Sequence, residues 1–184
     1  SLGTRGLCYR DDGRYALRVL DTLLGGGMSS RLFQRIREEA GLAYSVYSAC
    51  DFMRDTGLVS IHMGVSPDKG RRALALLRDE LDRLVQDGPT DEELDAVRMQ
   101  LKGSIVIGQE SVSNRMYHMS RQELYLGEYS PPERQVERYL AVTRDDVVAA
   151  ARRFLRPGRF SLMALGPIDG DPLGTSDWPL ELGA

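Results

Sequence analysis

The sequence has few of the residues that bind metal ions. Its 184 residues include two histidines, His62 and His118, which lie far apart and in neither an HExxH nor an HxxEH motif. The two cysteines, Cys8 and Cys50, lack the CxxC spacing of a zinc knuckle. A protein zinc site brings three or four such ligands together, so the sequence predicts no metal site within this chain.

Long apolar runs and an excess of basic residues are also absent. No segment approaches the roughly 18 apolar residues of a membrane-spanning helix, and no signal peptide opens the sequence. A net charge of −3 argues against nucleic acid or an anionic membrane as a partner. Two cysteines make no disulfide framework in a chain of this size, so both are expected as reduced thiols. The cytoplasm is therefore the expected compartment.

The glycine run Gly25, Gly26 and Gly27 does not match a nucleotide-binding loop. Its context, GGGMSSRL, has neither a GK[ST] ending nor the GxGxxG spacing, and it joins two predicted helices. A phosphate-binding loop follows a strand, so a flexible connection between helices is the simpler interpretation. Serine and cysteine hydrolases are disfavoured as well, because there is no GxSxG motif and no cysteine in a catalytic context.

Hydrophobic periodicity predicts a two-layer α+β domain in which an antiparallel sheet packs against helices. Strands are expected at 1–9, 42–52, 58–65 and 159–165, with a hairpin turn at 53–57. Helices are expected at 14–24, from Ser29 or Ser30 to 40, from 66 to 86, from 90 to 105, at 112–126, from 131, and at 143–155. Thr90 with Glu93, and Thr143 with Asp146, fit capping motifs. The domain is expected to cover 1–167, and 168–184 to form an extended or disordered tail.

The first strand is expected to be incomplete. The chain opens with SLGTRGLCY, which reads as the middle of a strand, and this suggests a piece of a longer protein. An incomplete strand would leave an unpaired sheet edge, which favours a homodimer of the isolated domain.

The segment LGGGMSSRLFQRIREEAGLAYSVYS (24–48) contains a candidate site formed by Arg37 and Tyr44. These residues are seven positions apart, and a helix-to-strand turn can bring them to one side of a sheet edge. A guanidinium and a phenol are both hydrogen-bond donors, and together they could stabilise a carbonyl oxygen as it becomes negative. The spacing alone favours the simpler alternative, a solvated arginine near a helix C-terminus beside a strand tyrosine.

The same segment resembles the signature of the second homologous domain in the insulinase, pitrilysin and mitochondrial processing peptidase family. The resemblance continues in DDGRYALRVLDTLLGGG, in ESVSNRMYHMSRQELYLGE at 110–128 and in LMALGP at 162–167, and it covers most of 10–167. It implies a tandem of similar α+β domains that enclose a chamber. Zinc in that family sits in the first domain, on an inverted HxxEH motif with a downstream glutamate.

The resemblance also implies roles for particular residues. Arg37 and Tyr44 match, by position, the arginine and tyrosine with which the second domain binds the substrate carbonyl opposite the zinc. Gly25, Gly26 and Gly27 are assigned to substrate recognition, by analogy with the glycine-rich loop of processing peptidases. The implied partners are a zinc-bearing homologous domain, on the same polypeptide or on a separate subunit, and a peptide substrate.

Three functions remain open on this basis. The leading one is the accessory half of a zinc endopeptidase that acts on peptides or unfolded polypeptides, with no cofactor and no activity in this chain alone. The second is a non-catalytic structural or assembly subunit with the same fold. The third is a stand-alone peptide-binding module, which would bind peptides without any partner.

Overall fold

A computed structural model describes residues 1–167 of the chain, and its strands form one antiparallel sheet in the order β2-β3-β1-β4. The strands are β1 (Leu2–Arg5), β2 (Ala43–Phe52), β3 (Gly57–Val65) and β4 (Ser161–Leu162). The α-helices are α1 (Arg14–Gly25), α2 (Gly70–Gln86), α3 (Asp91–Gly108), α4 (Val112–Leu126), α5 (Pro132–Leu140) and α6 (Arg144–Phe154). Shorter helical turns are η1 (Phe33–Glu39), η2 (Pro67–Lys69) and η3 (Pro157–Arg159).

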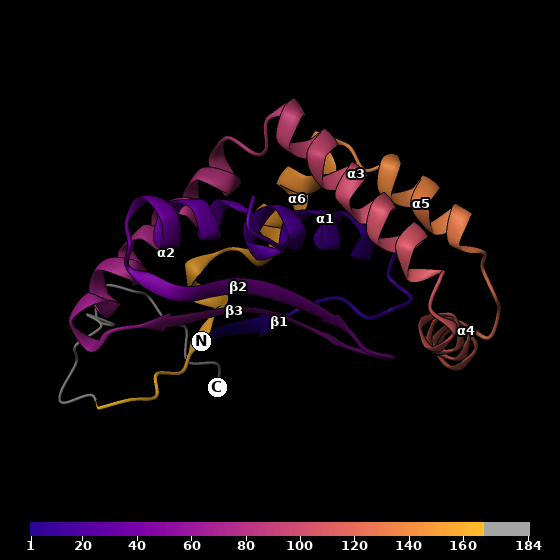
Figure 1. The fold of residues 1–184 in the computed structure, drawn as a ribbon, viewed down its shortest axis with the longest axis horizontal. Helices are drawn as coiled ribbons and strands as arrows, with labels where there is room; N and C mark the ends of the chain where they lie inside the picture. Colours follow the sequence, from indigo (N-terminus) through magenta and orange to yellow (C-terminus); the bar gives the residue numbers. More distant parts are fainter. Residues whose placement is uncertain (168–184) are drawn as a thin grey trace.

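The helices α1, α2, α3 and α6 form a layer on one side of the sheet, while α4 lies beyond one end of the strands (Figure 1). The core fills the space between the two layers, and α2 contributes a leucine stripe in which Leu77, Leu81 and Leu84 are fully buried. Side chains of β3 alternate, so Val59 and Ile61 face the helices. The predicted two-layer α+β fold is confirmed.

The first strand lies inside the sheet and is shorter than its neighbour. β1 pairs with residues 58–61 of β3 on one side and with β4 on the other, whereas residues 62–65 of β3 pair with β2 alone. The predicted strand at 1–9 is too long, because Gly6 and Tyr9 leave the ladder. Their N–H groups donate to the carbonyl oxygens of Gly57, the first residue of β3, and of Met53 in the hairpin turn. The predicted last strand, 159–165, shortens to β4. That the first strand continues upstream stays a prediction.

Both predicted capping boxes are present. Thr90 and Glu93 exchange hydrogen bonds at the start of α3, and Thr143 and Asp146 do so at the start of α6. The predicted cap by Ser29 or Ser30 is wrong, since the Ser30 hydroxyl donates to the carbonyl oxygen of Gly27 (2.5 Å).

The predicted tail at 168–184 lies outside the described residues. Within the described part, no helix has the length and apolar character needed to cross a bilayer.

Candidate functional site

The glycine run joins α1 to η1 and lets α1 approach the sheet closely. Gly25 is buried, and a Cβ there would clash with the backbone nitrogen of Ser48 in β2 and come within 2.7 Å of its hydroxyl. Gly26 and Gly27 are exposed. The three glycines line a hollow of about 380 Å³ together with Met28, Phe33, Val46, Tyr47 and Ser48. A Cβ at Gly26 would lie 2.5 Å from the Thr22 Cα, whereas one at Gly27 would meet no atom closer than 3.4 Å. The run therefore has a packing role at Gly25 and Gly26 and is open at Gly27.

Helix η1 is a π-helix, which the sequence pattern did not predict. Its closing hydrogen bond runs from the Ala40 N–H to the Arg35 carbonyl oxygen (3.2 Å), five residues back. Arg37 lies in this last turn, and its side chain is 45% exposed. The guanidinium is 4.7 Å from the centre of the Phe33 ring, and its only described ion pair is with exposed Glu38 at 3.8 Å. An ion pair that long and exposed contributes little, so Arg37 retains donors for another group.

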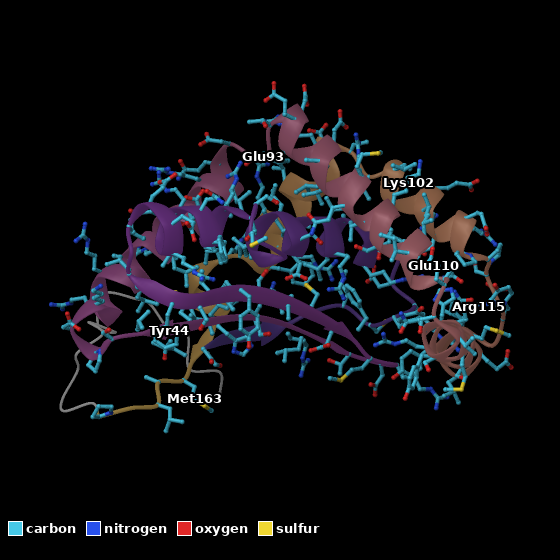
Figure 2. All side chains as sticks on the ribbon, in the orientation of Figure 1. Tyr44, Glu93, Lys102, Glu110, Arg115 and Met163 are labelled. Atoms are coloured by element: carbon cyan, nitrogen blue, oxygen red, sulfur yellow. The ribbon has the colours of Figure 1, made fainter. Side chains whose placement is uncertain are left out.

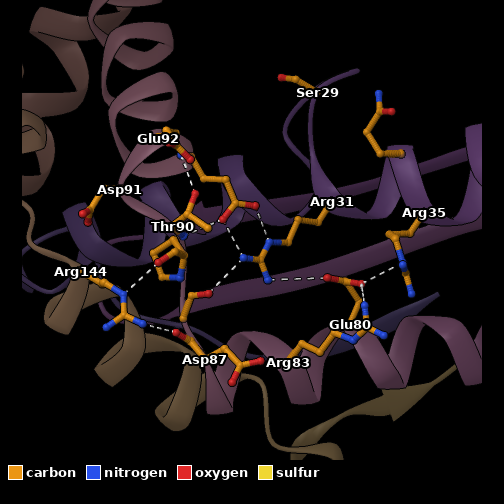
Figure 3. A pocket seen from close by; sticks show the side chains of 14 residues that line it. Ser29, Arg31, Arg35, Glu80, Arg83, Asp87, Thr90, Asp91, Glu92 and Arg144 are labelled. Atoms are coloured by element: carbon orange, nitrogen blue, oxygen red, sulfur yellow. Dashed lines mark hydrogen bonds and ion pairs between the residues drawn. The ribbon is translucent and has the colours of Figure 1, made fainter.

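An ion-pair network fixes η1 against α2 and α3 (Figure 3). Arg31 donates from Nε and Nη2 to the two Glu93 carboxylate oxygens, at 2.8 and 2.7 Å. These hydrogen bonds are the main reason why the pKa of Glu93 lies below its usual value. Buried Glu80 of α2 faces Arg31 at 3.6 Å and Arg35 at 3.4 Å. The segment that carries Arg37 is thereby held from two sides.

Tyr44 lies near the start of β2, where the pairing with β3 shifts register. Its side chain is 72% exposed, and a Cβ at Gly64 would lie only 2.6 Å from its ring. Gly64 alternates with the inward-facing residues of β3, so the ring rests on the face of the sheet away from the helices, as Figure 2 shows. Tyr47 lies on the same face, stacked on His62 with ring centres 4.9 Å apart. The Tyr44 hydroxyl has no hydrogen-bond partner among residues 1–167.

The structure groups the predicted site residues in two places rather than one. Through Phe33, Arg37 adjoins the hollow lined by Gly25, Gly26 and Gly27. Tyr44 instead lines a second cavity, of about 490 Å³, with the end of β3 and residues 162–167. Within residues 1–167, Arg37 and Tyr44 form no hydrogen bond or cation–π contact with each other.

A buried polar cluster beneath this region was missed at the sequence level. Asp21 of α1 is 5% exposed, accepts a hydrogen bond from the Ser48 hydroxyl (2.7 Å), and pairs with Arg18 (3.0 Å). Burial raises the pKa of Asp21 above its usual value, against the opposing effects of Ser48 and Arg18. An aspartate within the leucine-rich stretch 14–24 could have indicated a buried polar cluster. Its partner Ser48, on β2, could not be identified from the sequence.

The residues that could hold a metal do not converge. Within residues 1–167, no group of three or more histidine, cysteine, aspartate or glutamate side chains is placed to bind an ion. His62 is hydrogen-bonded to the Ser1 and Ser60 hydroxyls, and His118 to Gln122. The described residues therefore do not fit a zinc site of their own.

Comparison with known families identifies the domain. A family model described as the peptidase M16 inactive domain matches residues 2–101. The chain belongs to the peptidase M16 inactive-domain family. The resemblance found in the sequence is thus confirmed at the level of the family.

Relatives of this M16 inactive domain carry zinc protease names. The chain is 44% identical over 169 residues to an uncharacterized zinc protease of Streptomyces coelicolor, covering 91% of this chain and 36% of that protein. It is 34% identical over 171 residues to one of Bacillus subtilis, covering 93% and 42%. The M16 inactive domain described here therefore spans about two fifths of the length of these curated relatives.

Solved structures share the fold of this M16 inactive domain at lower identity. A protease from Helicobacter pylori aligns with a TM-score of 0.77 and 22% identity, over 86% of this chain and 38% of that one. An M16 inactive domain from Pseudomonas fluorescens aligns at 0.75 and 24%, over 86% and 39%. A chain of complex III2 from Candida albicans aligns at 0.76 and 14%, over 86% and 40%. These likenesses support the fold alone.

Proposed function

We propose that this M16 inactive domain is the accessory half of a zinc-dependent endopeptidase that acts on peptides or unfolded polypeptides. The zinc belongs to a homologous domain, on the same polypeptide or on a separate subunit, and when bound there it supplies an activated water. This chain contributes the residues that hold the substrate.

In this proposal Arg37 and Tyr44 bind the oxygen of the carbonyl that is attacked. The guanidinium carries a fixed positive charge, and the phenol donates one O–H. Both interactions strengthen as negative charge develops on the oxygen, which is the condition for lowering the barrier. The hollow at Gly25, Gly26 and Gly27 accepts a neighbouring part of the peptide.

One observation carries the proposal. Arg37 and Tyr44 are both largely exposed, and neither is occupied by a strong partner within residues 1–167. Glycine at position 64 leaves room for the Tyr44 ring, because a side chain there would clash with it. The ion pair between Arg31 and Glu80 holds the segment that carries Arg37. The zinc protease names of the relatives support the reaction class.

A structural or assembly subunit is the second candidate. The observation that favours it is the shared fold with a chain of Candida albicans complex III2, which shows that this architecture occurs within a larger assembly. Such a subunit needs neither donor for catalysis, so the two functions predict different results for substitutions at Arg37 and Tyr44. A homodimer of the isolated domain and a cytoplasmic location stay predictions, which light scattering and cell fractionation check.

The test is a fusion protein in which this chain replaces the aligned segment of the Streptomyces coelicolor relative. Cleavage of a quenched fluorescent peptide is measured with and without a zinc chelator. We expect chelator-sensitive cleavage that falls about 10- to 1000-fold in Arg37→Ala and in Tyr44→Phe, the range for losing one such donor. Arg115→Ala and Tyr129→Phe, at exposed positions elsewhere, are matched controls with wild-type turnover.

The outcomes separate the two candidates. Equal turnover in the wild type, Arg37→Ala and Tyr44→Phe, with cleavage still sensitive to the chelator, would refute the roles given to these residues. A folded, zinc-loaded fusion protein with no cleavage, where the intact relative does cleave the peptide, would favour the structural subunit.

A further inference from the structure

A basic cavity lies at the opposite end of β2 from Tyr44. It has a volume of about 620 Å³, within the usual range for ligand sites. Four elements enclose it, namely the start of α1, the end of β2 at Phe52, the helix α4 and the helix α5. Figure 1 shows α4 lying beyond the end of the sheet, and residues of this helix form one wall of the cavity. Tyr44 and Phe52 are eight residues apart on β2, so about 27 Å separates the two features.

The lining of this cavity is strongly positive although the chain is acidic overall. Six arginines face two carboxylates there, in a protein whose net charge is −3. The arginines are Arg10, Arg14, Arg18, Arg121, Arg134 and Arg138, and the acids are Asp12 and Glu128. Such a concentration of one sign within a concave site attracts an anion.

Most of these arginines have no carboxylate partner within residues 1–167. Arg18 pairs with Asp21 at 3.0 Å, and Arg138 pairs with Asp12 at 2.6 Å. The remaining four form no ion pair with an acid among residues 1–167, and three of them donate to neutral oxygens. The neutral acceptors are the Tyr125 carbonyl for Arg10, the Asp11 carbonyl and Tyr15 hydroxyl for Arg14, and the Phe52 carbonyl for Arg121.

Aromatic rings lie against four of these guanidinium groups, those of Arg14, Arg18, Arg121 and Arg138. Arg14 lies 4.9 Å from the centre of the Tyr9 ring and 4.5 Å from that of Tyr15. Arg121 lies 5.4 Å from Tyr9 and 5.8 Å from Tyr125. A guanidinium fixed in this way loses less rotational freedom when it binds a planar anion.

The position of Arg14 also conflicts with the dipole of its helix. It is the first residue of α1, whose first turn contains no acidic residue, and a positive charge is unfavourable at a helix N-terminus. The Asp11 carboxylate, which accepts from the Gly13 N–H (2.8 Å), offsets part of this repulsion, and an anion bound beside Arg14 would reduce it further. The feature adds to the argument from the arginine cluster and the cavity.

We propose that this cavity binds the acidic side chains of a polypeptide. A carboxylate matches the forked guanidinium and can accept two parallel hydrogen bonds from it. Tyr9 adds a donor, because burial raises the pKa of its phenol and keeps it protonated. The choice of a polypeptide as the source of the carboxylates rests on the proposed function. The cavity itself needs no zinc domain.

The test measures binding of a short, glutamate-rich fluorescent peptide to the 184-residue chain by anisotropy. The same peptide with glutamine at every glutamate position is the ligand control. We expect the glutamate peptide to bind at least about 10-fold more tightly, and its affinity to fall as salt is raised. Arg134→Gln and Arg121→Gln should each weaken binding by about 10-fold, the effect of one charge-assisted hydrogen bond.

The protein control is Arg115→Gln, an exposed position on the same helix α4 that lies outside the cavity lining (Figure 2), and it should bind like the wild type. Arg134 is exposed and outside the aromatic stacks, so its substitution preserves folding even where that of Arg121 does not. Equal affinity for the two peptides, or unchanged binding in Arg134→Gln, would overturn the proposal.

Two further measurements separate the alternatives. Inorganic phosphate should displace the peptide only weakly, and tighter binding of phosphate than of peptide would identify a small-anion site and overturn the choice of a polypeptide. Peptide binding is measured on the isolated chain without a zinc domain, whereas cleavage is measured in the fusion protein. Loss of cleavage in the fusion protein therefore reports on the proposed function, while loss of peptide affinity reports on this cavity.

Discussion

Substitution of Gly25 by alanine tests how closely α1 must pack against the sheet. Gly25 ends α1, and a Cβ there would meet both the backbone and the side chain of Ser48 in β2. Neither can yield easily, because Ser48 is paired with β3 and its hydroxyl donates to buried Asp21. We expect α1 to be displaced from β2 and the Ser48–Asp21 hydrogen bond to lengthen.

The expected loss of stability follows from three contributions. Overpacking of a close contact costs about 1–3 kcal/mol. Weakening a hydrogen bond to a buried carboxylate costs about 1–3 kcal/mol. Alanine returns at most about 1 kcal/mol through its higher helix propensity, and less at the last position of a helix. The free energy of unfolding should therefore fall by about 1–6 kcal/mol.

Urea unfolding followed by circular dichroism measures this difference, and Gly103→Ala is the matched control. Gly103 lies inside α3, and a Cβ there meets no atom within 4 Å. That substitution should raise the free energy of unfolding by about 0.5–1 kcal/mol, through helix propensity alone. If Gly25→Ala is as stable as the wild type, or gains stability as Gly103→Ala does, the argument for close packing at Gly25 is wrong.

Two further predictions concern titratable groups. Hydrogen bonds from Arg31 lower the pKa of Glu93, so this carboxylate adds stability above its ordinary pKa of 4.5 and loses that contribution as the pH falls through its lower folded value. The stability difference between the wild type and Glu93→Gln should be fully present at pH 7 and shrink below about pH 4.5, and a difference that grows in acid would contradict this. Burial raises the pKa of the Cys50 thiol, so Cys50 should react with a thiol reagent only after unfolding, whereas half-buried Cys8 should react in the folded protein. Equal reaction rates in the variants Cys8→Ser and Cys50→Ser, which each keep one cysteine, would contradict this prediction.

The parts of the fold that depend on local sequence could be predicted. The capping boxes at Thr90 and Thr143 involve residues three positions apart, and the leucine stripe of α2 follows helical periodicity. The lengths of β1 and β4 depend instead on pairing with residues about 60 and 160 positions away. The π-helical geometry of η1 also escaped prediction, because its apolar spacing fits an ordinary α-helix. The ion pairs that link η1 and the preceding Arg31 to α2 and α3 join residues that are distant in sequence.

In the candidate site too, local features could be predicted from the sequence and features that depend on distant contacts could not. Arg37 and Tyr44 are both exposed, and their role toward a ligand stays a prediction. Their separation into two hollows depends on Phe33 and Gly64, which the spacing of seven residues does not reveal. The basic cavity was missed entirely, since its arginines come from α1, α4 and α5 and from the loop before α1. Along the chain they are interleaved with acids, and only the folded structure gathers them.

The length of β2 sets a scale for any ligand that uses both ends of the domain. The strand extends for ten residues from the Tyr44 end to Phe52 at the arginine cavity, and it is paired with β3 along this length apart from the register shift beside Tyr44. A single extended peptide that touched both features would need at least about eight residues between its two contact points. Shorter peptides could occupy one end only. Peptides whose acidic residue lies at least that many residues from the part bound near Tyr44 would gain affinity from the second contact. The length of β2 would then determine which peptide lengths bind most tightly.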